Sequence, residues 1–316
     1  MRSSNLKLGF GLTTLIFTVI ISACGETDTK KQHDKKVNLK DYIPKVIYGE
    51  DDRIDLYQEQ NIALLNMADS TVALISAFDL QQKGNVTNIT TIPYANSYSL
   101  PLCQNERFRE QEIAPFCSGF LVAPNVIVTA GHCVQTQGST NSDCSTTRFV
   151  FGFNIATAGY RPTSVPSSEV YKCKQIIKQV IVSNGADFSV VELDRDVTNH
   201  SPLRLRRSGT AQINDELVVI GHPSGLPTKI AGGAKVRELF TDFISASLDT
   251  YGGNSGSAVF NSLTGEVEGI LVRGEEDFVS NGTCMSSKKC AQDSCRGEDV
   301  TKISNVLPYL PMTTTP

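Results

Sequence analysis

The sequence is short of basic charge and of long apolar runs. Its 29 lysines and arginines are outnumbered by 33 acidic residues, and the formal net charge is -4. Because nucleic-acid binders carry a basic surplus, we predict no nucleic-acid partner. The apolar run from Leu8 to Ile21 is shorter than the roughly 20 residues that a spanning helix needs. These shortages argue against a nucleic-acid-binding protein and against a helical transmembrane protein.

The same apolar run has the order of residues found in export signals. Arg2 and Lys7 precede it, and it ends in the sequence ISAC at residues 21–24. This ending resembles the lipobox of bacterial lipoproteins, whose cysteine becomes the lipidated first residue of the mature protein. We therefore expect residues 1–24 to be a lipoprotein signal peptide. A plain signal peptide with an incidental cysteine is the alternative.

The residues that follow are predicted to hold the folded part near a membrane without entering it. The stretch 25–52 is polar and charged and has no hydrophobic period, which predicts a flexible tether. Lipid on Cys24 would anchor a monomer to a bacterial envelope membrane, on the periplasmic or cell-surface side. Gly25 is not the aspartate that retains some lipoproteins in the inner membrane, and this favours the outer membrane.

The cysteine count indicates the same compartment. Nine cysteines minus Cys24 leave eight, an even number typical of a chain oxidised outside the cytoplasm. A metal site is the alternative, but Cys284, Cys290 and Cys295 lack paired CxxC spacing and a nearby histidine. We expect no metal and no organic cofactor. The cysteines whose partners stay open are Cys103, Cys144, Cys173, Cys284, Cys290 and Cys295.

Amphipathic helices are scarce, and short β-branched runs separated by turn residues fill the chain. They include STVALISAF, CSGFLVA, NVIVTA, RFVFGF, DFSVVELD, DELVVIGH, DFISASL and GEVEGILVRG. This pattern predicts antiparallel all-β barrels or sandwiches. Only residues 298–310 have helical spacing, which predicts a terminal helix. The strand groups divide near residues 197–201, giving expected domains at 53–198 and 199–316.

Ser255, in the stretch GGNSGSAVF, is the candidate nucleophile. A serine hydroxyl needs a base and a group that orients the base, and the chain has only four histidines. His33 lies in the tether, His200 lies at the crossing, and His222 in IGHPSG is interpreted as a turn residue. His132 directly follows a strand and is fastened by its neighbour, since a disulfide from Cys117 to Cys133 would pin its loop.

Three stretches together resemble the trypsin/chymotrypsin-like serine peptidases. VTAGHC resembles their histidine motif, GADFSVVEL their aspartate motif and GGNSGSAVF their serine motif, in the family's order His132, Asp187, Ser255. The resemblance covers roughly residues 71–310 and is nearest the bacterial branch that contains the glutamyl endopeptidases. It implies two six-stranded antiparallel β-barrels, chymotrypsin-like, with a C-terminal helix.

The resemblance also implies a role for each matching residue. Ser255 attacks the scissile carbonyl, His132 takes and returns the proton, and Asp187 orients the imidazole and stabilises its charged form. The backbone N–H groups of Gly253 and Ser255 form the oxyanion hole. The strand that pairs with the bound peptide matches LVRG, which places Val272, Arg273 and Gly274 among the substrate-binding residues.

Two departures from the family affect how the site is held. Trypsin has an aspartate before the nucleophile, which a new amino terminus neutralises, whereas this chain has Asn254. We therefore expect the site to form without such an insertion, so that removing residues 25–53 leaves activity within an order of magnitude. Tyr251 replaces a cysteine that braces the pocket in many animal members, so rigidity must come from elsewhere.

Specificity rests on the residues before the serine motif. Asp249 lies six residues before Ser255, where trypsin places the carboxylate of its primary pocket, and Thr250 follows it. A desolvated carboxylate there selects lysine or arginine before the scissile bond, and the acidic stretch 275–277 adds to this preference. The alternative is that Asp249 caps a turn and points away. Glutamate-specific relatives place a histidine on the strand at 269–274, and none is present.

The sequence as a whole predicts a lipid-anchored serine endopeptidase that cleaves proteins or peptides after basic residues. A catalytically idle, protease-like surface binding module is the first alternative. An esterase with the same triad is the second. The intact triad argues against the binding module, because an idle protein has no chemical use for three such residues.

Overall fold

The computed structural model describes residues 48, 51–134, 143–291 and 294–311. The expected signal peptide, the lipidation site Cys24 and most of the expected tether lie outside these residues. Within them, no helix combines the length and the apolar character that crossing a membrane requires.

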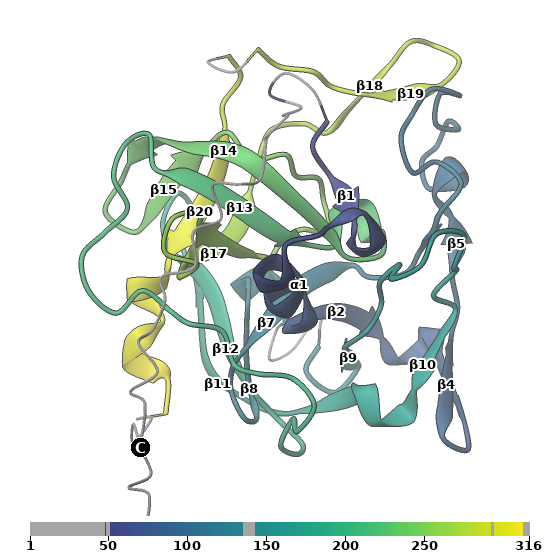
Figure 1. Ribbon diagram of the computed structural model, residues 1–316, viewed down its shortest axis with the longest axis horizontal. Coiled ribbons are helices and arrows are strands. Elements are labelled where there is room, and N and C mark those ends of the chain that lie inside the picture. The colour runs from purple at the N-terminus through teal and green to yellow at the C-terminus, as the bar shows by residue number, and fades with distance from the viewer. Residues whose placement is uncertain (1–47, 49–50, 135–142, 292–293, 312–316) are drawn as a thin grey trace, which may run out of the picture. The chain divides into compact units, whose positions relative to one another are not determined.

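The first barrel is a closed antiparallel sheet of six strands in the order β11-β12-β8-β7-β2-β9 (Figure 1). Strands β2 and β7 are buried along their whole length, as their apolar, β-branched composition favours. The strands are β2 (Thr71–Ser76), β7 (Cys117–Ala123), β8 (Val126–Thr129), β9 (Thr147–Val150), β11 (Val170–Ile181) and β12 (Asp187–Leu193).

The second barrel contains six strands in the order β14-β13-β16-β17-β20-β15, and pairing of β14 with β15 closes it. The two six-stranded antiparallel barrels confirm the predicted chymotrypsin-like fold. The strands are β13 (Glu216–Gly221), β14 (Lys229–Leu239), β15 (Phe243–Ala246), β16 (Ala258–Asn261), β17 (Val267–Arg273) and β20 (Glu298–Lys302). The predicted crossing at 197–201 lies between β12 and β13.

Smaller elements surround the barrels. The helix α1 (Ile62–Asp69) is capped by the Asn61 side chain, which accepts from the Ala63 amide at 2.9 Å. The short strands are β1 (Ile54–Asp55), β3 (Leu80–Lys83), β4 (Val86–Ile89), β5 (Ile92–Pro93), β6 (Glu112–Ile113), β10 (Ser164–Pro166), β18 (Phe278–Ser280) and β19 (Met285–Ser287). Single 3-10 turns span Leu56–Gln58, Ala77–Asp79, Tyr94–Asn96, Gly131–Cys133, Ser167–Glu169 and Pro223–Gly225.

The predicted terminal helix is present but shorter than its sequence pattern. Residues 298–302 form β20, and only Ile303–Asn305 and Leu307–Tyr309 turn as 3-10 helices. The second barrel needs a strand between β17 and β15 to close, and this pairing overrides the local helical spacing. Pro308 lacks the N–H that a longer α-helix would need.

The end of the expected flexible tether is instead part of the folded body. The side chains of Tyr48 and Asp52 are buried, and β1 pairs with β14, with Ile54 opposite Ile230. The prediction of a tether that runs to residue 52 is therefore wrong at its end. The polar residues there are held by charges in the fold, which composition alone does not reveal.

Four disulfides join all eight cysteines other than Cys24. They are Cys103–Cys284, Cys117–Cys133, Cys144–Cys173 and Cys290–Cys295. The expected Cys117–Cys133 bond is among them. Such bonds persist in oxidising compartments, so they indicate a protein that acts outside the cytoplasm.

His200 fastens the crossing segment to the first barrel. Its Nδ1 lies 2.9 Å from the Asp69 carboxylate and its Nε2 lies 2.8 Å from the Glu169 carboxylate. The ring stacks on Phe151 with centroids 4.1 Å apart. Burial by itself would lower the pKa of His200, but the hydrogen bonds to Asp69 and Glu169 outweigh it and raise the pKa to about 9.

The contacts of His200 with Asp69 and Glu169 predict a loss of stability at alkaline pH. The folded-state pKa is raised, so the stabilisation is fully present below the unfolded value of about 6.5 and disappears as pH rises through about 9. Asp69 is exposed, so we discount for solvent and expect a loss of about 1 kcal/mol in the free energy of unfolding. Urea unfolding at several pH values, compared with His200→Gln, measures it. Parallel pH profiles for the two proteins would contradict the assignment.

Candidate active site

His132 and Asp187 are brought together by neighbouring strands of the first barrel. His132 lies in the turn after β8, Asp187 begins β12, and these two strands are paired. The His132 Nδ1 lies 2.8 Å from Asp187 Oδ2, and the His132 amide donates to Oδ1 at 3.2 Å. Both carboxylate oxygens therefore hold one histidine, which fixes the orientation of the ring.

The glycine before His132 makes this approach possible. A Cβ on Gly131 would lie 2.3 Å from the Val180 carbonyl oxygen and 2.8 Å from Asp187 Oδ1. The second barrel also holds Asp187, because its amide donates to the Thr301 hydroxyl of β20 at 3.1 Å. The aspartate thus sits where the two barrels meet.

Ser255 comes to the same place through its backbone. Its carbonyl accepts from the Ser118 amide of β7 at 2.8 Å, and the same oxygen lies 3.5 Å from the Sγ of Cys133, the residue after His132. Within the described part of the chain, the Ser255 hydroxyl makes no hydrogen bond. Catalytic hydrogen bonds are often long without substrate and tighten in the complex.

The expected oxyanion donors belong to a loop whose backbone carbonyls are held by hydrogen bonds. The Gly252 carbonyl accepts from the Ser224 amide at 2.5 Å, and the Gly253 carbonyl accepts from the Ser118 hydroxyl at 2.9 Å. The Gly252 carbonyl and the Gly253 N–H belong to the same trans peptide, in which the two groups point in opposite directions. Because the carbonyl points toward Ser224, the Gly253 N–H points away from Ser224. Among the described residues, the amides of Gly253 and Ser255 donate to no protein acceptor.

Glycine is required at 253 for two reasons. Its φ is +91°, which side chains rarely adopt, and a Cβ there would lie 2.7 Å from the His222 carbonyl oxygen. His222, expected as a turn residue, is fully buried behind this loop, where its amide donates to the Ser118 hydroxyl at 2.9 Å. Burial lowers the pKa of His222 to about 3, so the ring is neutral.

A cavity of about 200 Å³ opens beside Ser255. Three expected substrate-binding residues, Val272, Arg273 and Gly274, line it. The other lining residues are Tyr251, Gly252, Leu271, Glu275, Asp277 and Glu298. The cavity therefore lies between the serine loop and the end of β17, where the resemblance places the primary pocket.

Asp249 does not line this cavity, so its expected role is corrected. Its Oδ1 accepts from the Tyr48 amide at 3.1 Å and its Oδ2 accepts from the Asp52 amide at 3.2 Å. Thr250 is likewise absent from the lining, and its hydroxyl donates to Glu298 at 2.7 Å. Both residues line an adjacent cavity of only about 30 Å³. Asp249 binds the chain's own backbone because the preceding segment folds against it.

Glu298 is the acidic residue that the sequence interpretation missed. It lines both cavities and is 6% exposed, and its Oε1 accepts from the Glu275 amide at 3.0 Å. Burial raises the pKa of Glu298 to about 8 and the pKa of Asp277 to about 6. The helical spacing of residues 298–310 predicts a helix at this position, and no motif marks Glu298. Only the closure of the barrel by β20 brings it to the pocket.

Two further positions concern how the site is held. The Asn254 Oδ1 accepts from the Ser257 hydroxyl at 3.1 Å, so this amide has a neutral partner. The sulfurs of Cys117 and Cys133 lie near the His132 ring. They form a disulfide with each other, so they offer no thiolate to a metal.

Two antiparallel six-stranded barrels, a His–Asp pair and an adjoining serine loop define a chymotrypsin-like serine peptidase fold. Residues 117–270 match the sequence model of the trypsin-like peptidase domain. Glutamyl endopeptidase of Bacillus licheniformis is 23% identical over 200 residues, which are 61% of this chain and 57% of the relative's length. The chain thus spans little more than half of that relative.

Solved structures give weaker likenesses. A serine-to-alanine mutant of Rv3671c from M. tuberculosis, in an inactive form, is 14% identical with a TM-score of 0.46, covering 81% of this chain and 91% of that one. A serine endoprotease from Yersinia pestis is 14% identical with a TM-score of 0.43, covering 78% and 64%.

Proposed function

We propose that this protein is a serine endopeptidase that acts through Ser255, His132 and Asp187. The observation that carries the proposal is the His132–Asp187 pair, with Nδ1 bound to the carboxylate and Nε2 left for the nucleophile, beside the carbonyl-anchored Ser255. Ser255 attacks the scissile carbonyl while His132 takes its proton. The leaving amine departs with that proton, and water then hydrolyses the acyl-enzyme by the same steps.

The amides of Gly253 and Ser255 supply the electrostatic part of this mechanism. They bind the oxygen that becomes negative in the tetrahedral intermediate, and each such donor contributes roughly 3 kcal/mol. Ser118 and Ser224 orient the loop through its backbone, because they bind the Gly253 and Gly252 carbonyls.

We also propose that the protein is exported and anchored by lipid on Cys24 to a bacterial envelope membrane, where it acts on proteins or peptides as a monomer. The four disulfides support an oxidising compartment. The net charge of -4 gives no support to a nucleic-acid partner. Metabolic labelling with a palmitate analogue, lost in Cys24→Ala, tests the anchor.

For specificity we propose a basic residue before the scissile bond, recognised by Glu298 and Asp277 rather than by Asp249. Both carboxyl groups line the cavity that contains Ser255. A lysine or arginine side chain would form a charge-assisted pair with these carboxyl groups in their ionised form, whereas an acidic side chain would meet like charge wherever they are ionised. The name of the Bacillus relative is a reason to test glutamate substrates directly.

Active-site labelling tests the proposal against a protease-like binding module. We expect a fluorophosphonate to label the protein and expect Ser255→Ala to abolish the labelling, because only an activated hydroxyl reacts. Ser208→Ala, at an exposed serine, is the control and should label normally. Hydrolysis of ester substrates without cleavage of the matched peptide substrates would favour the esterase instead. Absence of labelling in the wild type would overturn the enzyme assignment.

A further inference from the structure

Tyr251 connects the Ser255 cavity to residues of other segments of the fold. It lines the Ser255 cavity and precedes the oxyanion residue Gly253 by two positions. Its ring stacks on Phe278 with centroids 5.1 Å apart, and the Arg53 guanidinium lies 4.1 Å from its centroid. Its hydroxyl donates to Ser287 at 2.8 Å. Tyr251 is therefore held by contacts on both its ring and its hydroxyl.

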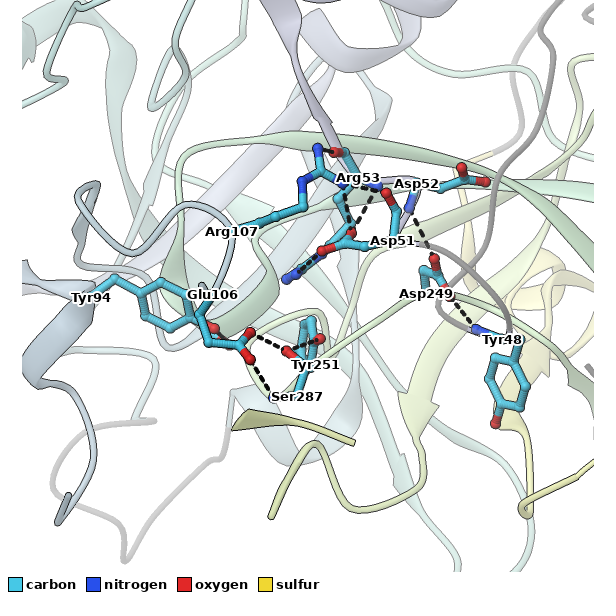
Figure 2. A network of polar contacts seen from close by, with 11 residues as sticks. Tyr48, Asp51, Asp52, Arg53, Tyr94, Glu106, Arg107, Asp249, Tyr251 and Ser287 are labelled. Atoms are coloured by element: carbon cyan, nitrogen blue, oxygen red, sulfur yellow. Dashed lines mark hydrogen bonds and ion pairs between the residues drawn. The ribbon is translucent and has the colours of Figure 1, made fainter. Parts of the chain in front are cut away.

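The Arg53 guanidinium that lies on the Tyr251 ring is itself held by an ion pair (Figure 2). Its Nε and Nη2 bind the two oxygens of Asp51 at 2.9 and 2.7 Å, and the residue is 1% exposed. A buried guanidinium is costly unless it is paired, and a bidentate pair fixes its plane. Arg107 closes the arrangement from outside by donating to the Arg53 carbonyl at 2.7 Å.

The same segment holds the pocket loop at a second point. The amides of Tyr48 and Asp52 bind the Asp249 carboxylate, two residues before Tyr251 (Figure 2). Immediately after Arg53, β1 pairs with β14, and Asp55 accepts from the buried ammonium of Lys229. The segment is thus anchored to the second barrel on one side and grips residues 249–251 on the other.

We propose that Asp51–Arg53 is a positioning brace of the active site, in which Arg53 holds Tyr251 and thereby sets the primary pocket and the Gly253 amide. The inference rests on the proposed peptidase function and names residues that act on it indirectly. It also changes the expectation that residues 25–53 are dispensable. Removing them takes away Arg53 and the two amides that satisfy the buried Asp249.

The test uses Arg53→Met in the full chain, with Arg195→Met as the matched control. Arg195 also lies over a tyrosine, 3.9 Å from the Tyr171 centroid, but in the first barrel and away from the site. Fluorophosphonate labelling first measures the fraction of protein with a reactive Ser255. Labelling of the wild type tests the proposed peptidase function separately from the role of Arg53. We expect kcat/KM per labelled serine to fall about 10- to 100-fold in Arg53→Met, and to be unchanged in Arg195→Met.

Two further readouts separate positioning from general stability. The loss should be larger for peptides that fill the primary pocket than for the small fluorophosphonate. Hydrogen exchange of residues 249–257 should accelerate at least about 10-fold while residues 117–123 stay protected. Wild-type kcat/KM per labelled serine, or unchanged exchange at 249–257, would overturn the proposal. If Arg53→Met does not fold, Arg53→Lys gives the same readouts, since it keeps the charge but loses the fork.

Discussion

Replacing Asp187 with asparagine is expected to lower kcat about 10⁴-fold with little change in KM. Both oxygens of this carboxylate accept hydrogen bonds from His132, one from the ring Nδ1 and one from the backbone amide. An asparagine amide offers one acceptor and one donor, so it cannot satisfy both. The ring then takes the tautomer with its proton on Nε2, and that nitrogen can no longer accept the Ser255 proton.

Steady-state kinetics on a peptide substrate, with Asp194→Asn as control, measures this effect. Asp194 follows β12 and accepts from the Lys172 amide at 3.0 Å, but it is far along the strand from His132. The Asp194 variant should retain wild-type kcat. A loss of less than tenfold in Asp187→Asn would show that the imidazole does not depend on this carboxylate for its tautomer.

The sequence predicted the parts of the molecule whose chemistry is local. The three motifs around His132, Asp187 and Ser255 each sit at a strand end, and strand order alone then brings two of them together. The positions of Val272 and Gly274 were predicted from the resemblance of LVRG to the family's substrate-pairing strand, and both residues line the cavity beside Ser255. In each case a short stretch carries both the reactive group and the turn or strand that presents it.

The parts that the sequence did not predict depend on contacts between distant segments. Glu298 reaches the pocket only because β20 closes a barrel, and its helical spacing pointed to a different structure. Asp249 had the right spacing from Ser255, but residues 48 and 52 compete for its carboxylate. Ser118 and Arg53 have no motif, because their function is to hold backbone or ring atoms that lie more than 130 residues away.

Glu298→Gln is expected to reduce kcat/KM for peptides with lysine or arginine before the scissile bond by about 100-fold, with little effect on peptides with leucine there. The glutamine keeps the shape of the side chain and can keep its bond to the Thr250 hydroxyl. It removes the charge and one of the two acceptor oxygens, the one that binds the Glu275 amide. A desolvated ion pair lost in this way costs a few kcal/mol, which corresponds to that factor. Glu276→Gln is the control, because Glu276 does not line the Ser255 cavity.

The pH dependence of the same variant shows whether the pocket selects a basic or an acidic side chain. Burial raises the pKa of Glu298 to about 8, so near neutrality Glu298 is mostly protonated in the empty pocket, and a basic side chain must displace that proton. The ratio of kcat/KM for lysine and leucine peptides cancels the titration of the triad. Above the pKa of Asp277, which burial raises to about 6, this ratio should rise with pH through about 8 in the wild type and stay flat in Glu298→Gln. An acidic side chain would instead bind the protonated carboxyl, so its ratio would fall over the same range. A lysine ratio that falls with pH, or a higher kcat/KM for glutamate peptides than for lysine peptides over the whole range, would assign this pocket to acidic substrates.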